Sequence, residues 1–114
     1  MEISIPALQA YLNHHYGGRG TETGMFMKLV EEMGEVAEIL NQRAGRKASD
    51  GKDLDAALAT ELADMIHYII AIAAINGLDM NKTILEKDKK ASRKYHHDIN
   101  LETYIRTMYT SKEW

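Results

Sequence analysis

Two segments of this chain place acidic residues on helices that are otherwise suited to a protein interior. The first spans residues 28–38 (KLVEEMGEVAE), and the second spans residues 61–64 (ELAD). Carboxylates are costly to bury unless a positive charge compensates them. A divalent cation held between two helices is the economical explanation of this pattern.

The composition predicts an all-α fold in a single domain covering residues 1–114. The chain contains one Pro and many residues that favour helices, and clusters typical of strands are scarce. Caps, Gly residues and apolar spacing predict a compact four- to five-helix bundle. The first expected helix starts at residues 4–6 and ends near Gly17, the second runs from around Thr23 to near Gly45, and the third covers roughly residues 53–76. A fourth helix is expected after Asp79 and continues to Tyr95, and a short last helix covers residues 101–108.

A helical projection predicts which residues face the core. The expected core residues of the second helix are Met25, Phe26, Leu29, Met33, Val36, Ala37 and Leu40. Those of the third helix are Leu54, Leu58, Leu62, Met65, Ile69 and Ile72. Glu32 and Glu35 lie just beyond the edge of the first arc. Glu61 falls inside the second arc, with Asp64 about 60° further round.

Together, the two acidic pairs favour a metal site. Either segment alone is compatible with a solvated helix face or with salt bridges at the edge of the core. Two antiparallel helices would instead bring the pairs together, and four carboxylates suit a hard cation such as Mg²⁺ or Mn²⁺. A di-iron site is less compatible, because Glu-x-x-His is replaced here by a single Asp64-x-x-His67.

The overall charge and the apolar segments limit the partners. The net charge is −3, so the chain lacks a broad basic surface for nucleic acid. The apolar run at 65–75 is too short to cross a bilayer, and no signal peptide is recognisable at the start. We therefore expect a cytoplasmic protein. The third helix is apolar nearly all round, which favours a central position or a subunit interface.

The paired motif Glu31-Glu32-x-x-Glu35 and Glu61-x-x-Asp64 resembles that of the MazG-like all-α nucleoside triphosphate pyrophosphohydrolases. That superfamily includes dimeric dUTPases, dCTP pyrophosphatases and phosphoribosyl-ATP pyrophosphohydrolases. The similarity covers about residues 25–95 and leaves a short helix and tail at 99–114. It implies a homodimer or a dimer of dimers.

The resemblance also implies roles for particular residues. Metal ligation is implied for Glu32, Glu35, Glu61 and Asp64, and catalytic roles for Glu31, Glu32 and Glu35. Contacts with the substrate are expected for Lys28, Tyr16, Asn41, Lys87, Lys94 and Tyr95. Ala91 stands where relatives carry Asn, so the contacts to the phosphates differ from the family pattern.

The implied reaction is Mg²⁺-dependent hydrolysis of a canonical or modified nucleoside triphosphate to the monophosphate and pyrophosphate, with Mn²⁺ as a substitute metal. Two alternatives remain open at this point. One is a related pyrophosphohydrolase acting on phosphoribosyl-ATP, dUTP or dUDP, and the other is a non-catalytic helical dimerisation module.

Overall fold

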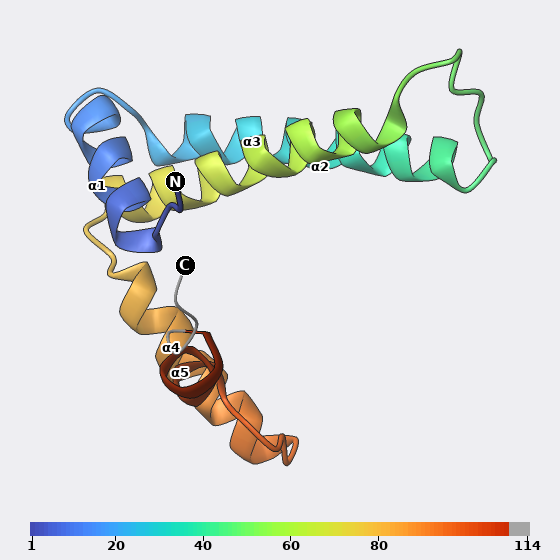
Figure 1. The fold of residues 1–114 in the computed structure, drawn as a ribbon. Coiled ribbons are helices and arrows are strands. Elements are labelled where there is room, and N and C mark those ends of the chain that lie inside the picture. The colour runs from blue at the N-terminus through green and yellow to red at the C-terminus, as the bar shows by residue number, and fades with distance from the viewer. Residues whose placement is uncertain (110–114) are drawn as a thin grey trace. The chain divides into compact units, whose positions relative to one another are not determined.

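The structure is a computed structural model, and it describes residues 1–109. Figure 1 shows the helices in chain order: α1 (Ile5–Tyr16), α2 (Glu22–Arg43), α3 (Leu54–Ile75), α4 (Met80–Lys94), α5 (Leu101–Tyr104) and the π-helix η1 (Ile105–Tyr109). Residues 1–109 contain no β-strand. The predicted all-α fold is confirmed, although the last helix continues as a π-helix where an α-helix was expected.

Short polar side chains start all five described α-helices. In each case the side-chain oxygen accepts a hydrogen bond from a backbone N–H three residues later, which satisfies a donor that the helix leaves unpaired. The capping residues are Ser4, Thr21, Asp53, Asp79 and Asn100. These caps explain why the helix boundaries lie within a few residues of those predicted from the sequence.

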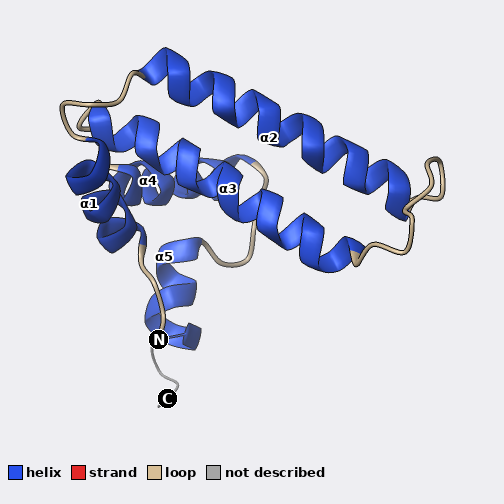
Figure 2. Cartoon of the chain, turned by 90° about the horizontal axis from the view of Figure 1, so that it is seen from above, coloured by secondary structure: helices blue, strands red, loops and turns tan. Residues whose placement is uncertain are grey.

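The chain divides into two compact units, Met1–Leu78 and Asp79–Trp114. In the first unit, α2 and α3 form a long antiparallel hairpin and lie side by side in Figures 1 and 2. Helix α1 packs against α3. The buried apolar residues of this unit are Leu12, Met25, Ile39, Ile70, Ala71, Ala73 and Ala74.

Helix α2 turns a different face toward α3 from the one predicted. Its buried residues Met25 and Ile39 lie seven residues on either side of Glu32, so all three share one face of the helix. Phe26, Met33, Ala37 and Leu40 were expected in the core but are exposed. The projection was wrong for these four residues because it turned the most apolar arc toward the neighbouring helix, whereas α2 directs Glu32 there. It was right for Met25, which is buried.

Helix α3 shows the same arrangement. Glu61 is half-buried toward α2, whereas Leu62 and Ile69, both expected in the core, are 43% and 42% exposed. We use the name outer apolar face for six exposed residues: Phe26, Met33 and Leu40 of α2, and Leu62, Ile66 and Ile69 of α3. On each helix these residues are centred about 100° round the axis, in the same sense, from the acidic residue that faces the other helix, Glu32 or Glu61. Because the two helices are antiparallel, both stripes lie on one side of the hairpin.

The apolar segment of α3 is longer than the 65–75 run considered in the sequence. An 18-residue window of this 22-residue helix has a mean hydropathy of 1.6, and by length and composition alone the helix is able to cross a membrane. The central helix of a soluble protein meets the same criterion. The helix also carries Glu61 and Asp64 within its length, which is costly in a bilayer.

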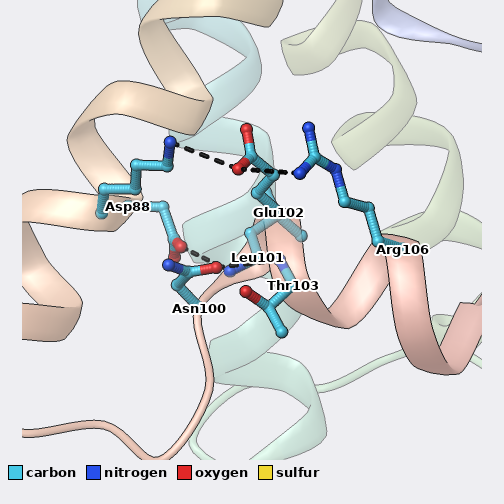
Figure 3. A network of polar contacts seen from close by, with 7 residues as sticks. Asp88, Asn100, Leu101, Glu102, Thr103 and Arg106 are labelled. Atoms are coloured by element: carbon cyan, nitrogen blue, oxygen red, sulfur yellow. Dashed lines mark hydrogen bonds and ion pairs between the residues drawn. The ribbon is translucent and has the colours of Figure 1, made fainter.

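In the second unit, polar contacts hold α5 against α4 (Figure 3). The Leu101 N–H donates to Asp88 Oδ2 at 2.6 Å. The Glu102 carboxylate forms ion pairs with Lys89 at 3.3 Å and with Arg106 at 3.8 Å. The apolar residues of the turn between α4 and α5 are largely exposed. The turn is therefore held by these polar contacts.

Candidate metal centre

Three of the predicted carboxylates meet between α2 and α3. One oxygen each of Glu32, Glu61 and Asp64 lies within 4.8 Å of the others, and all three residues are half-buried. Glu61 and Asp64 are three residues apart on α3, so they project from one flank of that helix. The antiparallel pairing predicted from the sequence therefore brings both acidic segments to one place.

Within residues 1–109, two carboxylate oxygens in this group lack a hydrogen-bond partner. Glu32 Oε2 and Glu61 Oε2 are buried, and neither accepts a hydrogen bond from any residue in the described range. Buried polar atoms normally have a partner, so an unpaired pair of oxygens points to a missing positive charge. Oxygen ligands without sulfur or imidazole suit a hard divalent cation. The residues present thus fit the metal that the sequence predicted.

Repulsion within the group changes the protonation of Glu61. A hydrogen bond shared with Glu32, partial burial and the nearby Glu35 raise the pKa of Glu61 from the ordinary 4.5 to about 7. The protonated form is favoured because adjacent carboxylates resist ionising together. A divalent cation would replace this proton and stabilise the ionised form.

The remaining acidic residues of α2 lie round the outer side of the helix. Glu35 is exposed, yet close enough to Glu61 to affect its pKa, and it lies outside the group of three. Glu31 forms an ion pair with Lys28 at 3.5 Å. Glu38 pairs with Lys47 at 2.8 Å, and this contact lowers the pKa of the Glu38 carboxyl.

A cavity of about 530 Å³ opens within the first unit, one helical turn from the carboxylates. Lys28 lies four residues before Glu32 on α2, and Tyr68 lies four residues after Asp64 on α3. The residues lining the cavity are His15, Tyr16, Arg19, Gly20, Thr21, Gly24, Met25, Lys28 and Tyr68. The cavity therefore combines aromatic rings with two cationic side chains.

The structure brings together two of the predicted substrate contacts, Tyr16 and Lys28, in this cavity. Arg19 and Tyr68 were not among the predicted contacts. The signal for Tyr68 was its spacing of one helical turn from Asp64, whereas Arg19 lies in a Gly-rich loop whose path periodicity does not predict. Asn41 is exposed near the end of α2, and its backbone carbonyl accepts a hydrogen bond from Arg46 N–H.

The other predicted contacts lie on the second unit. Lys87, Lys94 and Tyr95 are exposed on α4 or at its end. The Lys94 ammonium lies 5.4 Å from the centre of the Tyr95 ring, which is the geometry of a cation–π contact. Ala91, at the position where Asn was expected, is half-buried. Their roles toward a substrate stay predictions.

The first unit is thus an all-α unit in which acidic residues meet between two antiparallel helices. Residues 20–99 match the MazG nucleotide pyrophosphohydrolase domain, which covers more than half of the chain, and the chain belongs to this family. The family assignment supports nucleotide pyrophosphohydrolase activity in general and a nucleotide substrate.

One curated relative is a Bacillus subtilis (strain 168) protein described as "Uncharacterized protein YpjD". The two sequences are 28% identical over 71 residues, which is 62% of each chain. The aligned part of this chain thus spans less than two thirds of the relative's length. No solved structure matches the chain.

Proposed function

We propose that this protein hydrolyses a nucleoside or deoxynucleoside triphosphate to the monophosphate and pyrophosphate, with Mg²⁺ as the cofactor. The observation that carries the proposal is the group formed by Glu32, Glu61 and Asp64, with two buried oxygens that lack donors. Such a group repels a bare triphosphate and accepts one that arrives with a divalent cation.

The proposed metal ligands are Glu32, Glu61 and Asp64, with Glu35 completing the predicted set of four. A bound cation supplies charge neutralisation at the phosphoryl oxygens and lowers the pKa of bound water. Glu31 and Glu35, both exposed beside the group, are the proposed residues that orient the attacking water and take up its proton. Attack at the α-phosphorus breaks its bond to the bridging oxygen, and pyrophosphate leaves.

The cavity beside the carboxylates is the proposed site of the nucleoside. Its aromatic residues suit stacking on a base, and Lys28, which lines the cavity four residues before Glu32, is the proposed contact with a phosphate. Lys87, Lys94 and Tyr95 remain proposed contacts with the departing pyrophosphate. Asn41 remains a proposed contact with the base edge.

Self-association is part of the proposal. The outer apolar face exposes six large side chains on a single side of the α2–α3 hairpin, each 42–53% accessible. Large apolar side chains gathered on one side of a surface mark an interaction site. A second copy of the chain is the proposed occupant, giving a homodimer or a dimer of dimers in the cytoplasm, without nucleic acid or membrane partners.

The test is pyrophosphate release from a panel of canonical and modified nucleoside triphosphates in the presence of Mg²⁺. Turnover in H₂¹⁸O should place the label in the monophosphate, because the proposed attack is at the α-phosphorus. Glu32→Gln should abolish release, whereas the matched control Glu38→Gln, on the exposed side of the same helix, should retain it. A folded protein that releases no pyrophosphate from any nucleotide would favour the non-catalytic dimerisation module.

A further inference from the structure

Tyr16 is the last residue of α1 and one of the aromatic residues lining the cavity. Its hydroxyl lies 2.7 Å from His67 Nε2, a hydrogen-bond distance, although the two residues are 51 positions apart in the chain. The ring centres are 5.5 Å apart and nearly perpendicular, with an interplanar angle of 85°. A single polar contact thus ties the end of α1 to the middle of α3.

His67 lies behind the wall of the cavity. Within the described part of the chain it is not one of the lining residues, whereas its neighbours Tyr16 and Tyr68 both are. The ring of His67 contacts Tyr16 on one side and Tyr68 on the other, where the ring centres are 5.0 Å apart. The imidazole therefore connects the two tyrosines of the cavity.

The hydrogen bond matters because it fixes the hydroxyl end of the Tyr16 side chain, whereas the backbone carbonyl of Tyr16 accepts hydrogen bonds from the Arg19 and Gly20 N–H groups and its ring also packs against His15. The helix ends at this residue, and Gly17 and Gly18 follow, the second with a positive φ of 77°. Terminal residues of helices fray unless they are tied to the rest of the fold. The contact anchors the ring to α3, and Asp64 is only three residues before His67 on that helix.

The protonation of the pair is consistent with this arrangement. Burial and the nearby Tyr68 and Tyr11 raise the pKa of Tyr16, so its hydroxyl stays protonated near neutral pH. A protonated hydroxyl can donate to an unprotonated imidazole Nε2, which leaves Nδ1 carrying the proton. The bond can thus form without charging either side chain.

We propose that His67 is a positioning residue that holds the Tyr16 ring at a fixed distance from the metal-binding helix, so that the cavity binds a planar heterocyclic base. This inference rests on the proposed function for the identity of the ligand. The base stacks against Tyr16 while the phosphates lie at the carboxylates. His67 contributes to base affinity and selectivity and makes no contact with the reacting atoms.

The test measures binding directly, so that it does not depend on turnover. The probes are α,β-methylene nucleoside triphosphates of each base, with inorganic triphosphate as the probe that lacks a base, all in the presence of Mg²⁺. Calorimetry gives Kd for the wild type and for Tyr16→Phe, His67→Ala, His67→Gln and the double variant Tyr16→Phe/His67→Ala. Far-UV circular dichroism verifies that each variant is folded.

We expect Tyr16→Phe and His67→Ala each to raise the Kd for nucleotides about three- to thirtyfold. Both variants release the aromatic ring from its fixed position, and a well-placed ring that stacks on a base contributes about this much to the affinity, or more. The double variant should lose no more than the worse single variant, because both remove the same bond. His67→Gln should recover part of the loss, since an amide can replace the imidazole as the partner. Binding of inorganic triphosphate should not change.

Three outcomes would overturn the inference or separate it from the proposed function. Equal losses for nucleotides and inorganic triphosphate would mean that His67 has only a structural role. Unchanged nucleotide binding in both single variants, with a wild type that turns over nucleotides, would overturn the inference alone. Base-dependent binding that requires His67, in a wild type without turnover, would support the inference and contradict the proposed hydrolysis.

Discussion

The outer apolar face allows a sharp prediction about self-association, and Ile66→Asp is the substitution that tests it. Ile66 is 51% exposed in the isolated chain. Fully burying an Ile side chain contributes about 1.5–3 kcal/mol, so the exposed half contributes about 1 kcal/mol when a partner covers it. A twofold interface contains the residue twice, which doubles the loss.

The apolar contribution alone predicts a dimer weakened by about 2 kcal/mol, or roughly thirtyfold in Kd. Two unpaired carboxylates placed in the interface add a further cost, so we expect a loss of at least a hundredfold. Sedimentation velocity over a series of protein concentrations measures this directly. The matched control is Met27→Asp, because Met27 is 55% exposed on α2 but lies outside the outer apolar face.

A dimer that survives Ile66→Asp with unchanged affinity would refute the assignment of this face. So would a control variant that dissociates as readily as Ile66→Asp. A wild-type chain that stays monomeric at high concentration would remove self-association from the account altogether.

Three further predictions concern stability. The pKa of Glu61 is raised above its ordinary value, so its stabilising effect is complete below about pH 4.5 and is lost as the pH rises through about 7. The metal-free protein should therefore melt at a lower temperature at pH 8 than at pH 5.5, and Mg²⁺ should restore the melting temperature at pH 8. Glu61→Gln should reduce the dependence of the melting temperature on pH. A wild-type melting temperature that does not change with pH would contradict this. Gly17→Ala should destabilise the fold by about 1–3 kcal/mol in urea denaturation, because the added Cβ would lie 2.5 Å from the backbone oxygen of Asn13. The matched change Gly34→Ala, inside α2 and with no atom within 4 Å of the added Cβ, should instead stabilise by about 0.5–1 kcal/mol, and a loss there would mean that the position is covered.

The helices and their caps could be predicted from the sequence because local chemistry determines them. Asp53 and Asp79 are typical capping residues before apolar segments, and both cap helices in the structure. The end of the third helix depends on local chemistry in the same way, since Gly77 follows Asn76 in the left-handed region with a φ of 64°. Each of these features depends on a few neighbouring residues.

The orientation of the helices was harder to predict. A projection of α2 identifies its most apolar arc, and the usual assumption is that this arc faces the neighbouring helix. Here Glu32 faces α3, while Phe26 and Met33 are exposed. Sequence periodicity does not distinguish an apolar face that packs within the chain from one that requires another molecule.

The acidic site was predicted more accurately than the cavity beside it. The carboxylates follow from spacing along two helices, and Glu61 was conspicuous because it interrupts an apolar stripe. The cavity depends on the path of the loop after α1, which places Arg19 and Gly20 near Met25. The bond between Tyr16 and His67 joins residues far apart in sequence, and no local pattern predicts it.

The most direct test of the account is the binding of Mn²⁺, as a spectroscopic substitute for Mg²⁺, measured by electron paramagnetic resonance. The account predicts saturable binding by the wild type, lost in Glu32→Gln, Glu61→Gln and Asp64→Asn, and retained in Glu38→Gln. Binding that is equally strong in all five proteins, or absent from the wild type, would contradict a metal site between α2 and α3.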